Sequence, residues 1–260
     1  MSEPFEYLAF AHELADAAGV VLRRHYRARV EVDYKDDASP VTIADREAER
    51  CMRELIGVRY PDHGIGGEEF AGEQIDAEWM WSLDPIDGTK SFVIGRPSFG
   101  TLIGLLRNGR PVLGIIDQPI LHERWAGALG TPSKLNGDPI GVRPCPELAK
   151  AVLCTTSPQV FATPQEQAAF GGLERTVRFP VYGGDCYSYG LLAMGFADLV
   201  VEADLQLYDF AALVPVIEGA GGIITDWSGE PLRSGSDGRV IAAGDPRVHA
   251  HALELITRAL

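Results

Sequence analysis

The chemically richest stretch of the chain is residues 81–89, W-S-L-D-P-I-D-G-T, which holds two carboxylates three residues apart. Apolar and other residues alternate before Asp84, a pattern that predicts a strand. Pro85 cannot donate a ladder hydrogen bond, so we expect the strand to end near Asp84, and Gly88 allows a tight turn after it. Asp84 and Asp87 then repel each other unless one is protonated or a cation lies between them. Oxygen ligands on a stiff bend suit Mg²⁺ better than Zn²⁺.

The same residue types are common in ordinary surface turns, and short motifs match by chance. The metal interpretation therefore depends on what accompanies the motif. Acidic residues recur beside Gly or Pro, or at expected helix starts, in residues 39–45, 66–69 and 208–209, and a G-A-G-G run follows at 219–222. Several such clusters in one chain form a constellation and favour a metal site over a surface turn.

The order and spacing of these clusters resemble the inositol monophosphatase-like family of Mg²⁺-dependent, lithium-sensitive phosphatases. The resemblance extends from about Lys35 to Gly222, and its D-P-I-D-G-T core is highly specific. Carried over residue by residue, it implies ligands for two or three Mg²⁺ ions. These are the carboxylates of Glu68, Asp84, Asp87 and Asp209 and the main-chain carbonyl of Ile86.

The resemblance also assigns the remaining chemistry. Thr89 and Asp45 match the pair that polarises the attacking water, and the amides of Gly88 and Thr89 match those that hold the phosphate. Glu202 stands seven residues before Asp209, where the family places a substrate-contacting carboxylate. The implied fold is a layered α-β-α-β-α sandwich. Independently of any family, Asp45 in a first helical turn and Asp209 as an N-cap are ordinary positions for an acidic residue.

Within the family, several segments are similar to the histidinol-phosphate phosphatase branch. They are residues 95–102, 114–119, 123–125, 185–187 and 208–215. Inositol monophosphatases usually carry Trp where this chain has Tyr208 and Gly where it has Leu213, while Leu207 stands where the histidinol branch often has Pro. The resemblance thus implies hydrolysis of histidinol phosphate, a step of histidine biosynthesis, by metal-activated water. Asp185 and Glu202 would attract the ammonium and imidazole of that substrate.

Two other kinds of function stay open. The same chemistry could act on inositol monophosphate or on the 3′-phosphate of an adenosine bisphosphate. A catalytically idle, metal-binding regulatory protein of this fold is a further alternative. The complete set of carboxylates together with Thr89 argues against the idle protein, because a relic should lose some of them.

Composition narrows the choice of partners. The formal charge of −14 and the sequence pI of about 4.8 argue against nucleic acid and anionic membranes, which need a basic surface. A small phosphate ester is still possible, because bound Mg²⁺ inverts the local charge. The four cysteines show no C-x-x-C pair, so reduced thiols are expected. We expect a cytoplasmic protein, with no signal peptide and no membrane span, that forms a homodimer.

The elements that must position these residues follow from periodicity and breakers. Helices are expected over residues 4–26, 42–58, near 165, 187–195, 209–218 and 246–259. Strands are expected over residues 100–106, 112–117, 124–129, 151–155, 177–181, 199–202, 222–225 and 240–243, with a proline-rich connector over 131–146. We expect an α+β half over residues 1–140 with most metal ligands, and an α/β half over residues 141–260 with Asp209 and the substrate-contacting residues.

Overall fold

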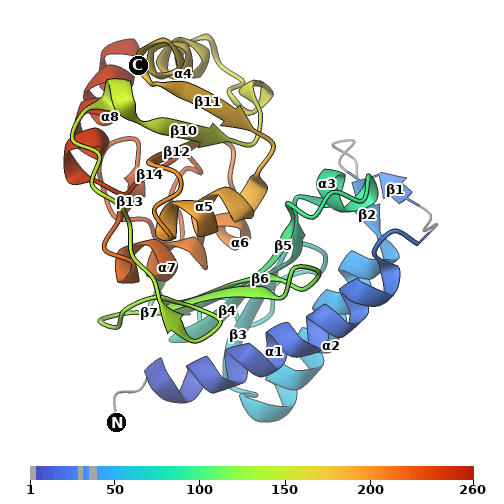
Figure 1. Ribbon diagram of the computed structural model, residues 1–260. Helices are drawn as coiled ribbons and strands as arrows, with labels where there is room; N and C mark the ends of the chain where they lie inside the picture. Colours follow the sequence, from blue (N-terminus) through green and yellow to red (C-terminus); the bar gives the residue numbers. More distant parts are fainter. Residues whose placement is uncertain (1–3, 29–31, 35–39) are drawn as a thin grey trace.

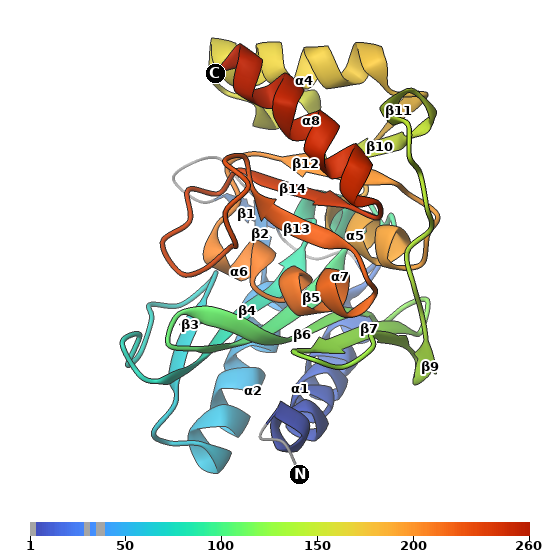
Figure 2. The ribbon, with the colours of Figure 1, turned by 90° about the vertical axis from the view of Figure 1, so that its left-hand side faces the viewer.

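The computed structural model describes residues 4–28, 32–34 and 40–260 (Figure 1). Helices and sheets alternate in layers, as the resemblance implied (Figures 1 and 2). The outer helices of one side are α1 (Pro4–His25) and α2 (Ile43–Arg59), and those of the other side are α4 (Pro164–Thr176) and α8 (Pro246–Ala259). Between the two sheets lie α5 (Asp185–Ala193), α6 (Leu207–Phe210) and α7 (Leu213–Gly219).

The sheet next to α1 and α2 has seven strands in the order β3-β4-β5-β6-β7-β8-β9. They are β3 (Gly64–Gly67), β4 (Trp79–Asp87), β5 (Gly100–Arg107), β6 (Arg110–Gln118), β7 (Glu123–Ala128), β8 (Lys134–Leu135) and β9 (Asp138–Pro139). β3 runs parallel to β4, and the other neighbouring pairs are antiparallel. Asn108 and Gly109 turn the chain between β5 and β6 with positive φ, as Asn-Gly commonly does in a tight hairpin.

The apolar sides of α1 and α2 cover one face of this sheet. Leu14 and Leu22 of α1 and Met52 and Ile56 of α2 are fully buried together with Trp81 of β4. Burial of side chains of this size contributes about 1.5–3 kcal/mol each to folding. The helical spacing of apolar residues in α1 and α2 therefore determines how these two helices pack against β4, the strand that carries Asp84.

The second sheet has five strands in the order β11-β10-β12-β14-β13. They are β10 (Val152–Thr155), β11 (Phe179–Tyr182), β12 (Leu199–Glu202), β13 (Ile223–Asp226) and β14 (Val240–Ala243). β10 is parallel to both β11 and β12, whereas β14 is antiparallel to β12 and β13. The sheet is thus mixed, and α4 and α8 cover its outer face (Figure 2).

A row of glycines lets the middle helices approach the seven-stranded sheet closely. Gly104, Gly114 and Gly127 are paired neighbours on β5, β6 and β7. A Cβ on Gly114 would lie 1.9 Å from the carbonyl oxygen of Ala212, and one on Gly127 would lie 2.3 Å from the carbonyl oxygen of Pro215. Only a bare backbone accommodates this contact. The row therefore sets the position of α6 and α7, and with them Asp209.

The structure differs from the sequence expectations in three places. β4 continues past Asp84 to Asp87, because Pro85 lies at a register shift where no ladder donor is required. The expected helix over 209–218 is two short helices, and Pro215 is tolerated as the third residue of α7, where an amide needs no intrahelical partner. The expected connector over 131–146 contains β8 and β9.

Short elements complete the described chain. They are β1 (Val32–Tyr34) and β2 (Pro40–Thr42), the helix α3 (Thr89–Val93) and two 3₁₀ turns, η1 (Leu148–Lys150) and η2 (Pro158–Val160). The sequence analysis had not anticipated β1, β2, β3 or α3. All four cysteines are free thiols, as expected. In the part of the chain that the structure describes, no helix has the length and apolarity needed to cross a bilayer.

Candidate active site

Three carboxylates meet at the end of β4. Oxygen atoms of Asp84, Asp87 and Asp209 all lie within 4.8 Å of one another. Asp84 Oδ1 accepts the amide hydrogen of Ile86 at 2.9 Å, which fixes it inside the bend. Asp209 is not an N-cap but the third residue of α6, where its Oδ2 accepts the amide hydrogen of Gln206 at 2.6 Å in a capping box. The sequence-predicted residues are therefore brought together from two distant segments.

The electrostatics of this cluster favour a cation. Burial raises the pKa of Asp84 well above its ordinary value, and the charges of Glu68, Asp87 and Asp209 raise it further. Burial and the charge of Asp185 raise the pKa of Asp87 to about 7. The pKa of Asp209 is raised by burial and by Asp87. Like charges withdrawn from water hold protons unless a cation replaces them, and hard oxygen ligands select Mg²⁺ or a similar ion. The donor set fits the metal that the resemblance implied.

Glu68 reaches the cluster through the parallel pairing of β3 and β4. Its amide donates to the Leu83 carbonyl at 3.2 Å, directly before Asp84. The carboxylate of Glu68 is near enough to Asp84 for its negative charge to raise the pKa of Asp84. The short strand β3, which the sequence pattern did not predict, therefore places the predicted ligand Glu68 beside Asp84.

Glu49 on α2 is a site-supporting residue that the sequence analysis also missed. It is fully buried, and its carboxylate accepts the amides of Glu69 at 2.7 Å and Phe70 at 3.3 Å and the guanidinium of Arg53 at 2.8 Å. A Cβ on Gly67 would lie 2.1 Å from Glu49 Oε1, so the loop fits closely over it. The i,i+4 pair of Glu49 and Arg53 was visible in the sequence, but such pairs are usually solvent-exposed and carry no site signal.

Asp45 lies in the first turn of α2, as predicted. Its Oδ2 accepts from the amide of Thr42 at 2.8 Å and from the Thr42 hydroxyl at 2.7 Å, whereas Oδ1 is buried and has no hydrogen-bond partner among the described residues. Burial raises the pKa of Asp45 to about 6 against the opposing effect of Thr42. One oxygen of a buried carboxylate is therefore left free to bind a further group. Residues 35–39, where the resemblance begins, lie outside the described residues.

Thr89 follows the bend as the first residue of α3. Its hydroxyl donates to the Ile86 carbonyl at 3.1 Å, the oxygen predicted as a metal ligand. Since Asp45 is bonded to Thr42, the described residues show no direct hydrogen bond between Thr89 and Asp45. Gly88 has φ +84, and the amides of Gly88 and Thr89 open α3 where a helix offers free donors.

Asp185 and Glu202 line one small cavity together with Asp87 and Asp209. Asp185 opens α5 with φ +46 and accepts the Ser91 hydroxyl at 2.9 Å, and burial raises its pKa. Glu202 ends β12, accepts the Thr156 amide at 2.6 Å and has its pKa raised to about 8 by burial. Both predicted substrate-contacting carboxylates therefore adjoin the predicted metal ligands.

Comparisons with known proteins agree with this geometry. A model of the inositol monophosphatase family matches residues 3–260. The chain is 50% identical over 257 residues to the bifunctional phosphatase IMPL2, chloroplastic, of Arabidopsis thaliana, which covers 95% of this chain and 74% of that protein. It is 38% identical to the histidinol-phosphatase of Mycobacterium tuberculosis, covering 85% of this chain and 88% of the other.

A solved structure gives the same result for the fold. The inositol monophosphatase from Zymomonas mobilis superposes with a TM-score of 0.91 and 49% sequence identity, covering 99% of this chain and 100% of the other. The superposition therefore covers nearly the whole of this chain. On the strength of this full-length agreement in sequence and fold, the chain belongs to the inositol monophosphatase family of phosphatases.

Proposed function

We propose that the protein is a Mg²⁺-dependent phosphatase that hydrolyses histidinol phosphate to histidinol and phosphate. The observation that carries the phosphatase activity is the convergence of Asp84, Asp87 and Asp209, beside Glu68, in a partly buried cluster where burial and acidic neighbours raise the pKa of the three aspartates. These four carboxylates and the Ile86 carbonyl would hold two or three Mg²⁺ ions. When bound, Mg²⁺ neutralises ester oxygens and makes a bound water more acidic.

The residues of the chain then have distinct roles in the proposed reaction. The amides of Gly88 and Thr89 donate to oxygens of the phosphate. Thr89 and Asp45 orient a water, and the free Oδ1 of Asp45 takes its proton. The water oxygen forms a bond to phosphorus while the bond from phosphorus to the ester oxygen breaks, and the leaving alkoxide acquires a proton. No covalent phosphoenzyme is needed.

The choice of histidinol phosphate rests on charge. Asp185 and Glu202 give acidic side chains to the cavity beside Asp87, where the alcohol part of a substrate would lie. An ammonium gains a charge-assisted hydrogen bond there, whereas a neutral polyol gains only weaker ones. Relatives with the name histidinol-phosphatase at 34–38% identity support this choice.

Inositol monophosphate is the second candidate. The 49% identity to a solved inositol monophosphatase and the 31% identity to an inositol-1-monophosphatase of Mycolicibacterium smegmatis favour it. An adenosine bisphosphate and the idle metal-binding protein are weaker alternatives.

One assay separates these possibilities. Phosphate release is measured side by side from histidinol phosphate, inositol monophosphate and adenosine 3′,5′-bisphosphate, with Mg²⁺ and with excess chelator. We expect the highest kcat/KM with histidinol phosphate and no release in chelator. Faster release from inositol monophosphate would favour the second candidate, and no release from any ester would favour the idle protein.

The homodimer and the cytoplasmic location stay predictions. An exposed apolar edge on β11 supports a dimer, because Phe179 and Val181 are 48% and 45% exposed. Sedimentation of the wild-type protein and of a Phe179→Ser variant would test it, since a dimer through this edge weakens in the variant.

A further inference from the structure

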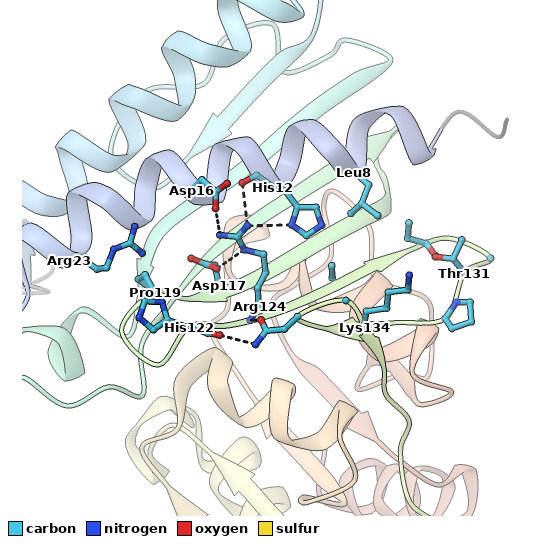
Figure 3. A pocket seen from close by; sticks show the side chains of 16 residues that line it. Leu8, His12, Asp16, Arg23, Asp117, Pro119, His122, Arg124, Thr131 and Lys134 are labelled. Atoms are coloured by element: carbon cyan, nitrogen blue, oxygen red, sulfur yellow. Dashed lines mark hydrogen bonds and ion pairs between the residues drawn. The ribbon is translucent and has the colours of Figure 1, made fainter.

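A cavity of about 940 Å³ lies away from the candidate active site, between α1 and the strands β6 to β8 (Figure 3). Successive side chains of β7 point to opposite faces of the sheet, one toward the helices of the candidate active site and the other toward this cavity. Trp125 and Gly127 face α5 and α7, whereas Arg124, Ala126 and Ala128 line this cavity. The volume is in the range of about 300–1,000 Å³ that is typical of small-molecule sites.

The wall of the cavity is largely apolar. Leu8 of α1, Ala126 and Ala128 of β7, and Pro119 and Pro132 of the flanking loops contribute to it. Leu8 lies near the Thr131 end and Arg23 near the Pro119 end (Figure 3). Because a helix rises about 1.5 Å per residue, the lining of α1 from residue 8 to residue 23 extends about 22 Å. An elongated organic molecule fits such a trough better than a compact ion does.

An ionic network around Arg124 forms the middle of the cavity, and within it Oδ2 of Asp117 has no hydrogen-bond partner among the described residues. Arg124 donates through Nε to Asp117 Oδ1 at 2.6 Å and through a terminal nitrogen to Asp16 Oδ1 at 2.8 Å. Burial, and then the charge of Arg124, lower the pKa of His12, so this ring is neutral near pH 7. Arg124 is therefore already paired with two carboxylates. These pairs hold the cavity wall rigid, and Arg124 needs no anionic ligand.

Two further cations form no ion pair of this kind, although the charge of Arg23 is near enough to Asp117 to lower the pKa of that carboxyl. Arg23 of α1 and Lys134 of β8 line the cavity, and neither forms an ion pair or hydrogen bond through its side chain with any described residue. Arginine and lysine thus outnumber the lining carboxylates Asp16 and Asp117, although the whole chain carries a formal charge of −14. A local excess of positive charge in an acidic protein selects anions.

We propose that this cavity is a second ligand site, distinct from the catalytic one, for an elongated organic anion of low molecular mass. Its apolar part lies along Leu8, Ala126 and Ala128, and its acidic groups pair with Lys134 or Arg23 at the two ends. The combination of an apolar wall, a rigid central network and unpaired terminal cations is what such a molecule needs.

The experiment uses two dyes of nearly equal apolar size. 8-Anilinonaphthalene-1-sulfonate carries a sulfonate, and N-phenyl-1-naphthylamine lacks it. Fluorescence titrations give the Kd of each dye for the wild type and for the double variant Arg23→Ala/Lys134→Ala. The control variant is Arg59→Ala, which removes an exposed arginine on α2, outside the cavity. Melting temperatures confirm that the variants are folded.

The wild type should bind the sulfonate dye, and the double variant should bind it about fivefold more weakly, since the single sulfonate loses one exposed ion pair of about 1 kcal/mol, which corresponds to about fivefold in Kd. The neutral dye should bind both proteins equally, and Arg59→Ala should resemble the wild type. Equal sulfonate-dye affinity in the wild type and the double variant would overturn the proposal. An absence of dye binding to the wild type, as when a second copy of the chain covers the cavity, would also overturn it.

Discussion

At the scale of single residues, the candidate site divides into groups that face a cation and groups that face water or substrate. Asp84, Asp87 and Asp209 have pKa values that are raised first by burial and then by the charges of acidic neighbours. Asp45 differs, because one of its oxygens is bonded to Thr42 and the other is free. Substitutions at the two groups should therefore have different kinetic signatures.

We predict that Asp45→Asn and Thr89→Ala lower kcat by about 100-fold or more while KM stays close to the wild-type value. Both residues act on the nucleophile, and loss of a proton acceptor costs about 10²–10⁴ in rate. Asn retains an oxygen acceptor for Thr42, so α2 keeps its cap. Steady-state kinetics and circular dichroism check this. A rise in KM alone would show that the residue binds the ester and does not act on the water.

We predict that Asp185→Asn lowers kcat/KM for histidinol phosphate by about ten- to a hundredfold, because a charge-assisted hydrogen bond of about 1.5–3 kcal/mol is lost. Hydrolysis of p-nitrophenyl phosphate, which carries no cation, should barely change. Asn tolerates the positive φ of this position and can still accept from Ser91, so the local structure persists. Equal losses on both esters would mean that Asp185 supports the metal ligands or the fold.

Asp84 and Asp87 on the bend of β4 could be predicted because binding of Mg²⁺ requires oxygen ligands, which narrows the choice of residue types. Glu49 could not be predicted, since its role depends on loop residues Glu69 and Phe70 meeting α2 after the chain has folded. Nothing in the sequence around Glu49 reports that contact. Asp209 was found, but its position within α6 was not, because a capping box and an N-cap use the same residue types.

At the scale of elements, the row of Gly104, Gly114 and Gly127 decides how closely α6 and α7 lie on the seven-stranded sheet. Helix and strand periodicity predicted most element positions correctly, including β12, β14 and α8. The role of these glycines cannot be predicted from the sequence, since they become neighbours only when the three strands pair. The split between α6 and α7 falls at Ala211 and Ala212, which lie against Gly104 and Gly114.

We predict that Gly114→Ala destabilises the protein by about 1–3 kcal/mol, the usual cost of overpacking, and weakens Mg²⁺ binding by displacing α6. The matched control is Gly57→Ala on the exposed side of α2, where a Cβ meets nothing within 4 Å. That change should stabilise the protein by about 0.5–1 kcal/mol. Denaturant unfolding and Mg²⁺ titration provide the measurements. Unchanged unfolding of Gly114→Ala would refute the close-packing argument.

At the scale of the whole molecule, the two sheets and the helices between them press carboxylates from β4, α6 and α5 into one place. Asp84, Asp87, Asp209 and Asp185 all have raised pKa values caused first by burial. The fold thus accepts an unfavourable concentration of negative charge at its centre, in a chain whose formal charge is already −14. A bound cation should relieve that cost and stabilise the whole protein.

We predict that Mg²⁺ raises the melting temperature relative to excess chelator, by roughly 5–10 °C at about 100 times its Kd, from the linkage of binding to stability. NaCl at matched ionic strength should produce much less of this shift, because screening does little for buried charges. In Asp84→Asn the Mg²⁺ shift should nearly vanish. In chelator that variant should melt no lower than the wild type, since one member of the repelling cluster is gone. Differential scanning calorimetry measures the melting temperature of each protein under each of these conditions. A full Mg²⁺ shift in Asp84→Asn would place the metal elsewhere.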